Sequence, residues 1–316
     1  MDKIHSDSLH RGLSRREVLT LLIGAGIGVA SGRLAAHTSG DELILRAIPR
    51  SGERIPVLGL GSSGTFEVDT SAAERAPVRA VLERYVELGG RVLDTSPMYG
   101  TAETVIGDVA GQLGISAKLW LATKVWTRGR EAGIEQMEQS FRRLRTGRID
   151  LMQVHNLIDT QTHLDTLRGW KEQGRIRYIG VTHYRVDAFE ELARVIRNET
   201  LDCVQFNYSI ATREAERMLL PLAAEQRTAV LINRAFEDGR LFAQVRGKPL
   251  PAWAAEFDCS SWAQYFLKYV ISHPAVTCVI PATSKLKHLV DNMGAGRGRL
   301  PDAAMRTRMV AHFESL

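Results

Sequence analysis

The sequence predicts an α/β protein built as a (β/α)8 TIM barrel, and three observations support this prediction. The chain has 316 residues, of which 44% are hydrophobic and 24% charged, a composition that excludes collagen, coiled coil and wholesale disorder. From residue 43 onward, short apolar segments alternate with amphipathic stretches, and no linker rich in Pro, Gly or Ser divides them. Eight such apolar segments occur, which is the number of strands that closes this barrel.

The predicted strands are short apolar runs, most of which end in a polar residue. They are Val57 to Leu60, Arg91 to Asp94, Leu119 to Lys124, Ile149 to His155, Tyr178 to His183, Cys203 to Asn207, Val230 to Asn233 and Thr277 to Pro281. The stretches between them have helical spacing, as in the apolar series Ile134, Met137, Phe141 and Leu144. An open doubly wound sheet, the alternative architecture, would have fewer strands and a glycine-rich first turn.

A β-hairpin is predicted ahead of the first strand. The segments Leu43–Ala47 and Glu53–Val57 flank Pro49-Arg50-Ser51-Gly52, a run of residues that favours a turn. We expect this hairpin to cap the bottom of the barrel, the end where the strands begin.

Residues 1–40 have the layout of a signal peptide, whereas residues 41–316 are predicted to form the barrel domain. Arg15 and Arg16 precede the weakly apolar run Leu21 to Ala30, which is followed by small residues. This arrangement resembles a twin-arginine signal, and it implies export of the folded protein to the periplasm by the twin-arginine translocase. The apolar run is too short for a stable membrane span, which needs about 20 residues. The alternative is a flexible basic terminus on a cytoplasmic protein.

Charge and cysteine content exclude several other classes of protein. The net charge is +5, but the first 40 residues hold five of the 41 basic and three of the 36 acidic residues, which leaves +3 for the barrel. The chain has neither a polybasic arm nor a basic patch with interleaved aromatic residues, so no nucleic-acid partner is predicted. Three cysteines without a Cys-x-x-Cys pair predict buried thiols, with no disulfide framework and no metal site.

Polar or ionisable residues stand at the ends of six predicted strands. Barrel active sites are assembled at the C-terminal ends of the strands, where side chains from different strands converge. One polar residue at a strand end is ordinary, but six at equivalent positions predict a site. They are Asp94, Lys124, His155, His183, Asn207 and Asn233.

Four residue types near these strand ends fit the reduction of a carbonyl group. Hydride addition requires a proton donor for the developing alkoxide, and Tyr99 can serve if a nearby cation lowers its pKa from about 10. Lys124 would be that cation and Asp94 would hold its ammonium in place. His155 can donate a hydrogen bond to the carbonyl oxygen. The alternative for the Lys124–Asp94 pair is a purely structural ion pair.

The segments that contain these residues resemble the aldo-keto reductase family in order and spacing. They are Val92–Gly100, Ala122–Trp126, Phe141–His155 and Gly174–Val181, and the match runs from about Pro56 to Asn292. The resemblance implies a (β/α)8 barrel that uses NADPH without a Rossmann fold. It also implies a catalytic tetrad in which tyrosine is the general acid, lysine and aspartate tune it, and histidine orients the carbonyl: Asp94, Tyr99, Lys124 and His155.

The resemblance implies nicotinamide contacts that this chain matches in part. Gln205 falls at the position that holds the carboxamide, although burial in the sixth strand is an alternative for it. Thr182 and His183 replace the usual Ser-Asn pair. Thr182 can keep the hydroxyl contact, whereas His183 leaves the contact with the carboxamide open. After the seventh strand, Asn233-Arg234 replaces a stacking tyrosine. Arg234 is expected either to meet the pyrophosphate or to be a solvated residue at the rim.

A phosphate site is predicted after the eighth strand. A helix is expected to begin near Ser284, where its N-terminus and the charge of Lys285 would attract a phosphate group. The resemblance implies that this segment, which includes Thr283, binds the adenosine 2′-phosphate, with Asn292 at the adenine. His288 stands where arginine is common, so NADPH is expected with NADH possible. The alternative for Ser284 is a helix N-cap.

Phe66 and Trp126 fall where the family lines its substrate pocket with aromatic residues, with ordinary loop packing as the alternative. The predicted function is therefore NADPH-dependent reduction of a small aldehyde or ketone, or the reverse reaction; the oligomeric state stays open. Two other functions remain at this stage. One is a redox-sensing module that binds nicotinamide with little turnover, and the other is a cofactor-free lyase or isomerase on the same barrel.

Overall fold

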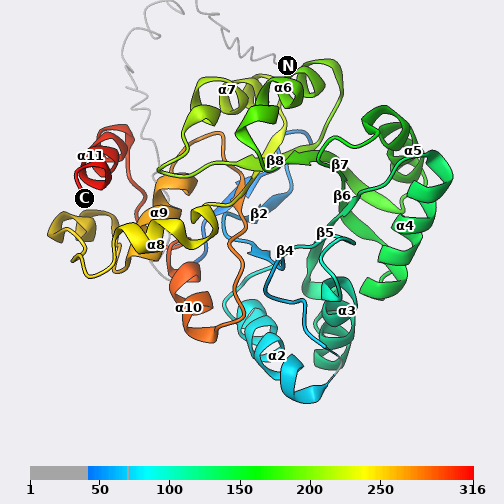
Figure 1. The fold of residues 1–316 in the computed structure, drawn as a ribbon, viewed down its shortest axis with the longest axis horizontal. Coiled ribbons are helices and arrows are strands. Elements are labelled where there is room, and N and C mark those ends of the chain that lie inside the picture. Colours follow the sequence, from blue (N-terminus) through cyan, green and yellow to red (C-terminus); the bar gives the residue numbers. More distant parts are fainter. Residues whose placement is uncertain (1–41, 70) are drawn as a thin grey trace, which may run out of the picture. The chain divides into compact units, whose positions relative to one another are not determined.

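The computed structural model describes residues 42–69 and 71–316, and the predicted signal peptide lies outside these residues. The strands of the main sheet are β3 (Leu60–Gly61), β4 (Val92–Asp94), β5 (Trp120–Val125), β6 (Ile149–His155), β7 (Ile176–His183), β8 (Cys203–Asn207), β9 (Ala229–Asn233) and β10 (Cys278–Val279). They lie side by side in chain order, and each neighbouring pair is parallel. The predicted set of eight strands is confirmed (Figure 1).

The segment around β3 closes the sheet against β10 by two parallel bridges, Leu58 with Val279 and Gly61 with Ala282. This contact is close: a Cβ atom on Gly61 would lie 2.8 Å from a backbone oxygen of β10's continuation, and one on Gly59 would lie 2.8 Å from the Ile280 side chain. The first regular strand is therefore Leu60–Gly61 and not Val57 to Leu60. The two glycines let the backbone approach its neighbour, but bare backbone makes only a short ladder.

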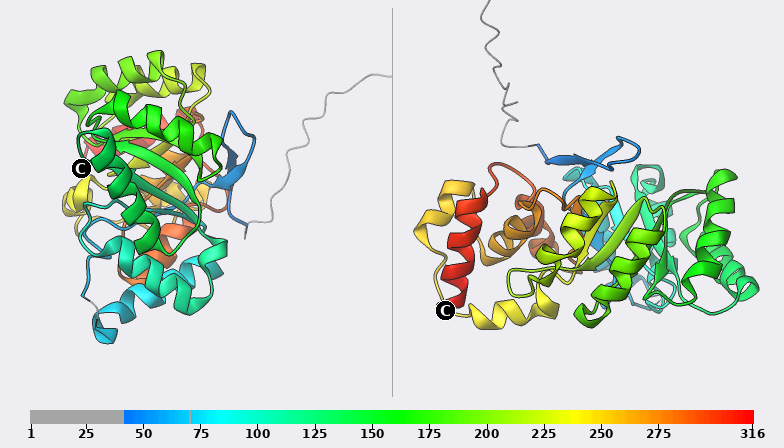
Figure 2. Two further views of the ribbon diagram at one scale, coloured as in Figure 1. Left: turned by 90° about the vertical axis from the view of Figure 1, so that its right-hand side faces the viewer. Right: turned by 90° about the horizontal axis from the view of Figure 1, so that it is seen from above.

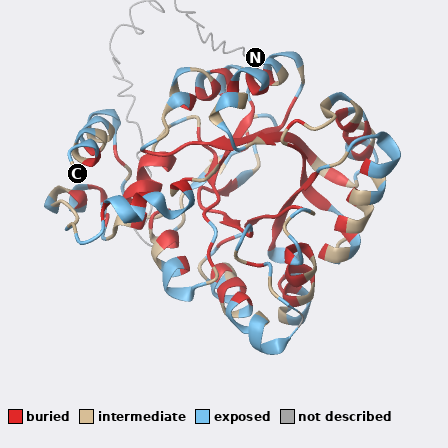
Figure 3. Ribbon diagram, viewed as in Figure 1, coloured by how far each residue is buried: buried red, intermediate tan, exposed pale blue. Residues whose placement is uncertain are grey.

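The helices surround the sheet and turn their apolar faces toward it (Figures 1 and 3). In α4, Met137, Phe141 and Leu144 are buried, as their spacing predicts. Among the described residues, no helix has the length and apolar character needed to cross a membrane. The α-helices are α2 (Ala72–Glu87), α3 (Ala102–Leu113), α4 (Arg130–Leu144), α5 (Thr160–Glu172), α6 (Phe189–Asn198), α7 (Leu219–Glu225), α8 (Arg240–Gln244), α9 (Trp262–Ile271), α10 (Leu286–Gly294) and α11 (Ala303–Glu314). The 3-10 helices are η1 (Ser116–Lys118), η2 (Val186–Ala188), η3 (Glu214–Arg217), η4 (Glu237–Gly239) and η5 (Ala252–Phe257).

A separate apolar cluster fills the lower interior of the barrel. All three cysteines are free and buried, as predicted, and two of them belong to this cluster. Its members are Ile48, Ile55, Val92, Trp120, Ala122, Leu151, Tyr178, Cys203, Ala229, Leu231, Cys278 and Ile280.

The barrel interior changes from apolar to polar toward the C-terminal ends of the strands. Alternate residues of a strand face the same side, so Trp120, Ala122 and Lys124 of β5 all point inward. Space for long polar side chains near the top comes partly from Gly180, where an added Cβ would lie 3.2 Å from the Gln153 side chain. The sequence thus places a layer of polar side chains above the apolar cluster that fills the lower barrel.

The predicted hairpin forms from β1 (Leu45–Ala47) and β2 (Arg54–Pro56), which pair antiparallel. Its residues Ile48 and Ile55 are fully buried in the interior cluster, so the hairpin caps the bottom of the barrel as expected (Figure 2). Glu53 fixes it there by accepting hydrogen bonds from Arg177 at 2.7 Å and from the Tyr178 hydroxyl at 2.5 Å.

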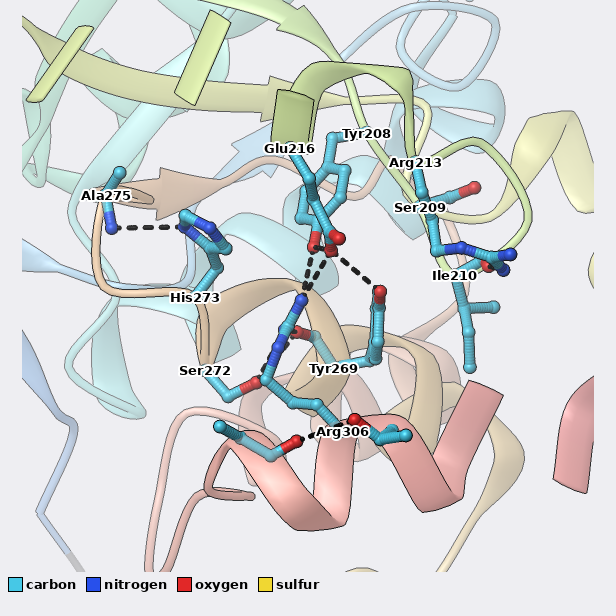
Figure 4. Close-up of polar contacts among 12 residues, drawn as sticks. Tyr208, Ser209, Ile210, Arg213, Glu216, Tyr269, Ser272, His273, Ala275 and Arg306 are labelled. Atoms are coloured by element: carbon cyan, nitrogen blue, oxygen red, sulfur yellow. Dashed lines mark hydrogen bonds and ion pairs between the residues drawn. The ribbon is translucent and has the colours of Figure 1, made fainter. Parts of the chain in front are cut away.

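A polar cluster outside the barrel holds the C-terminal helix. Arg306 of α11 donates to the Glu216 carboxylate and to the Tyr208 hydroxyl, both at 2.6 Å, and Tyr269 of α9 donates to the same carboxylate at 2.8 Å (Figure 4). These bonds join α11 to η3 and α9. The role of this cluster is structural.

Candidate active site

The four predicted catalytic residues meet at the C-terminal ends of β4, β5 and β6, an opening here called the mouth. Lys124 is fully buried, and its Nζ donates to Asp94 Oδ2 at 2.6 Å and to the Thr95 carbonyl at 2.7 Å. The ring of Tyr99, on the loop after β4, has its centroid 5.1 Å from Nζ. It meets the His155 ring edge-on, with centroids 6.1 Å apart.

The Lys124–Asp94 pair keeps a charge in the interior of the protein. Burial by itself would lower the pKa of the Lys124 ammonium, but the adjacent Asp94 carboxylate outweighs burial and raises that pKa. The lysine is therefore an ammonium ion at every physiological pH.

The electrostatics of Tyr99 differ from the sequence-based expectation. Burial raises the pKa of Tyr99, and the Lys124 ammonium offsets only part of that increase. The expectation that Lys124 brings the pKa below 10 is wrong, because desolvation of the phenolate exceeds the attraction of a cation that Asp94 already neutralises. Tyr99 consequently holds its proton at neutral pH, which suits a proton donor.

His155 is neutral in the folded protein. Burial, followed by the positive charge of Lys124, lowers the pKa of its imidazole to about 2. Its Nδ1 lies 3.1 Å from the hydroxyl of Ser96, which is fully buried. When Ser96 donates to Nδ1, the ring proton is on Nε2, where it is free to be donated to a ligand oxygen. Ser96 was not predicted, although it stands two residues after Asp94 and therefore on the same side of the chain.

Amide side chains form a network around the other oxygen of Asp94. Gln205 donates to Asp94 Oδ1 at 2.9 Å, and Gln153 donates to the same atom at 3.2 Å. The Gln205 carbonyl oxygen accepts from Thr182 at 3.3 Å and from Asn233 at 3.2 Å. Gln153 was missed at the sequence level. It stands two residues before His155 on β6, and that period of two is the signal that would have found it.

His183, at the end of β7, and Arg234, in the loop after β9, both contact Tyr184. His183 stacks on Tyr184, with ring centroids 5.8 Å apart and an interplanar angle of 6°, and the Arg234 guanidinium lies 5.5 Å from the Tyr184 centroid. Arg234 also pairs with Asp238 at 2.5 Å. A cavity of about 350 Å³ opens beside them, lined by Tyr184, Arg185, Val186, Asp187, Asn207, Thr212, Arg234, Glu237 and Arg240. Tyr184 was not predicted.

The predicted phosphate segment precedes α10, which begins two residues later than expected. The N-cap position is Lys285, so the alternative that Ser284 is the N-cap is wrong; the Thr283 hydroxyl accepts from the Lys285 backbone N–H at 3.1 Å. Lys285 and Lys287 are exposed, and neither forms an ion pair with any residue that the structure describes. Burial and these two cations lower the pKa of His288. Lys287 was missed, and Asn292 is buried on the same helix.

The two aromatic residues predicted for the substrate pocket differ in exposure. Phe66 is fully buried in the main hydrophobic core, and its backbone N–H donates to the Ser62 carbonyl. Trp126 is 42% exposed on the loop after β5, where Gln136 bonds to both its backbone N–H and its carbonyl. Of the two, Trp126 alone presents surface at the mouth.

This fold and site define a barrel enzyme that is equipped to protonate an oxygen atom. The chain belongs to the aldo/keto reductase family, since residues 57–308 match the model of that family, and it is therefore an oxidoreductase. It is 29% identical over 245 residues to methylglyoxal reductase YeaE of Escherichia coli (strain K12), covering 75% of this chain and 84% of the relative. It is 25% identical to the uncharacterized oxidoreductase YqkF of Bacillus subtilis (strain 168), covering 75% of this chain and 90% of the relative.

Two solved structures show the same architecture. An aldo-keto reductase from Klebsiella pneumoniae in complex with NADPH superposes with a TM-score of 0.67 at 25% identity, covering 86% of this chain and 96% of that chain. The holo form of aldo-keto reductase AKR11C1 from Bacillus halodurans gives a TM-score of 0.69 at 22% identity with the same coverage.

Proposed function

We propose that the protein uses NADPH to reduce an aldehyde or ketone to an alcohol, with Tyr99 as the proton donor. The observation that carries this proposal is the buried Lys124–Asp94 pair beside a protonated Tyr99 and a neutral His155. Related proteins of the family support it, because one is named a methylglyoxal reductase and another is crystallised with NADPH. A small carbonyl compound is the proposed substrate.

The side chains at the mouth fit NADPH, a nicotinamide adenine dinucleotide that carries a 2′-phosphate. At the proposed phosphate end, Lys285 and Lys287 supply positive charge at the start of α10 that no acidic side chain of the described residues pairs with, as a 2′-phosphate requires. At the inner end, several buried polar atoms have no hydrogen-bond partner within the described residues and so can bind a polar ligand. They are the Oδ1 atoms of Asn156, Asn207 and Asn233 and the Nε of Arg234.

Bound NADPH supplies a hydride to the carbonyl carbon, and the protein's own residues manage the oxygen. His155, being neutral, donates its Nε2 proton as a hydrogen bond that orients the carbonyl. As negative charge develops on that oxygen, the Tyr99 hydroxyl transfers its proton to it, and the Lys124 ammonium stabilises the resulting phenolate. Solvent then returns a proton to Tyr99. Because the pKa of Tyr99 is raised, its hydroxyl holds the proton that reduction requires.

A Tyr99→Phe variant tests this function. It should lose carbonyl reduction by about 10²-fold or more while it still quenches NADPH fluorescence on binding. Tyr265→Phe is the matched control, since the Tyr265 hydroxyl bonds to the Met309 carbonyl outside the barrel. Turnover retained in Tyr99→Phe would refute the assigned role. Quenching without NADPH consumption across a panel of aldehydes and ketones would indicate a redox-sensing module, and no NADPH binding would favour lyase or isomerase chemistry.

We further propose that the protein is exported to the periplasm by the twin-arginine translocase. The support is the Arg15-Arg16 pair ahead of a short apolar run, which lies outside the described residues. Transport in the folded state would let the enzyme carry its cofactor across the membrane. A reporter fused after residue 40 should be exported, and changing Arg15 and Arg16 together to Lys should block its export. Equal export of both forms would refute the proposal.

A further inference from the structure

We propose that Ser96 is a positioning residue for carbonyl reduction: its hydroxyl donates to Nδ1 of His155 and so fixes the tautomer that carries the ring proton on Nε2. This inference rests on the proposed function, since it concerns the group that orients the carbonyl oxygen. The Ser96 oxygen lies 3.1 Å from Nδ1, and both side chains are buried. Because a hydroxyl and an imidazole can each donate or accept, the other partners of the two groups decide the direction of this bond.

A turn directly after β4 fixes the position of the Ser96 side chain. The Ser96 backbone carbonyl accepts from the backbone N–H of Tyr99 at 3.0 Å, and Pro97 occupies the second place of the turn, which its fixed φ angle favours. The Ser96 hydroxyl oxygen also accepts from the backbone N–H of Met98, at 3.4 Å. One four-residue turn therefore positions both the serine hydroxyl and the proposed proton donor, Tyr99.

The hydrogen-bonding capacity of Ser96 decides the direction of its bond to His155. Among the described residues, the Ser96 hydroxyl has two partners, the Met98 backbone N–H and the His155 Nδ1. The Met98 N–H can only donate, so Nδ1 is the acceptor that these residues offer to the hydroxyl proton. If Nδ1 carried the ring proton instead, the fully buried hydroxyl would receive two N–H groups and its own proton would have no acceptor. The arrangement with Ser96 as the donor satisfies every group.

The resulting tautomer places a proton where the reduction needs one. A neutral imidazole has a single N–H, so a hydrogen bond accepted at Nδ1 leaves the proton of His155 on Nε2. Nε2 forms no hydrogen bond with any residue that the structure describes, and the ring meets that of Tyr99 edge-on. The Nε2 proton is therefore available to a carbonyl oxygen. The other tautomer would present a lone pair to that oxygen and repel it.

NMR spectroscopy measures the tautomer directly. Long-range ¹⁵N–¹H correlation spectra of the full-length chain, labelled with ¹⁵N-histidine and free of added cofactor, distinguish a protonated ring nitrogen from an unprotonated one. The signals of His155 are those that a His155→Phe variant lacks. At neutral pH, we expect the wild type to have a protonated Nε2 and a hydrogen-bonded, unprotonated Nδ1, and Ser96→Ala to lose that hydrogen bond. A protonated Nδ1 in the wild type, or unchanged His155 signals in Ser96→Ala, would overturn the proposal.

Steady-state kinetics test the effect of this bond on the reaction. Ser96→Ala should lower kcat for carbonyl reduction by about threefold to tenfold, because the group that stabilises the developing oxyanion loses one neutral hydrogen bond. Ser96→Cys, whose thiol is a weaker donor, should recover part of this loss. Ser140→Ala is the matched control, since Ser140 is also fully buried but its hydroxyl donates to the Gln136 backbone carbonyl in α4. Its kcat should equal that of the wild type.

A double variant separates positioning from a general effect on packing. If Ser96 acts through His155, Ser96→Ala should not lower kcat further in a His155→Phe background. An equal loss in both backgrounds would overturn the proposal. A wild-type chain that reduces no aldehyde or ketone of the panel would instead overturn the proposed function, while the NMR spectra would still report the tautomer. The two failures are therefore distinguishable.

Discussion

The ammonium of Lys124 lies 2.6 Å from the carboxylate of Asp94, and both side chains are almost completely buried. A buried ion pair contributes little net stability, but removal of one partner is costly because the other charge is left unpaired. The pair also stands beside Tyr99, so we expect it to contribute to catalysis as well as to stability. Single and double variants can separate the two contributions.

Lys124→Met should reduce kcat by about 10²-fold or more and lower the free energy of unfolding by about 3–5 kcal/mol, because it leaves the Asp94 carboxylate buried without its cation. Urea unfolding and steady-state kinetics measure the two effects. The double variant Lys124→Met/Asp94→Leu should regain much of the stability while staying inactive. Recovery of activity in the double variant would show that the pair is only structural.

Stability should depend on pH through His155. The pKa of its imidazole is about 2 in the folded protein and 6.5 when unperturbed, so below pH 6.5 the unfolded chain binds a proton that the folded protein does not. The free energy of unfolding should therefore fall as the pH is lowered, by about 2 kcal/mol between pH 7.5 and pH 5 from this residue. Urea unfolding at both pH values measures the loss, and His155→Gln should reduce it. An identical pH dependence in the two proteins would contradict the buried neutral state.

The hairpin at the bottom of the barrel should contribute stability without affecting catalysis. Ile48→Ala removes a fully buried side chain from the interior cluster and should lower the free energy of unfolding by about 2–5 kcal/mol. Leu45→Ala in the same hairpin, where the side chain is 39% exposed, should cost much less. At a temperature where both variants are folded, kcat/KM should equal that of the wild type. A large loss of kcat/KM in Ile48→Ala would show coupling between the two ends of the barrel.

The cations at the start of α10 should set the preference between cofactors. Lys285→Ala/Lys287→Ala removes two positive charges and should weaken NADPH binding about tenfold or more while NADH binding changes little. Fluorescence titration at two salt concentrations measures this, since the wild-type preference should shrink as salt rises. Lys118→Ala in η1, at the opposite end of the barrel, is the control. Equal weakening of NADPH and NADH binding would argue against a 2′-phosphate site.

Much of the fold could be predicted because its signals are local. The apolar runs indicated eight strands, and the period of the apolar residues in α4 indicated its buried face. The first strand was displaced because two glycines carry no side-chain pattern, and pairing with β4 and β10 fixes their position. The start of α10 was placed too early because Thr283, and not Ser284, makes the hydrogen bond that orders the turn.

The sequence by itself determined the barrel, the cap at its base and the four residue types of the catalytic group. Strands that alternate with helices run parallel, so the residues at their C-terminal ends meet at one opening. Tertiary structure alone decided how those residues behave. Closure of the barrel brought Gln205 to Asp94 across 111 positions of sequence, and its amide donates to that carboxylate. Burial likewise raised the pKa of Tyr99 in spite of its neighbouring cation. Desolvation and hydrogen-bond saturation depend on every group around a side chain, and most of those groups are distant in the chain.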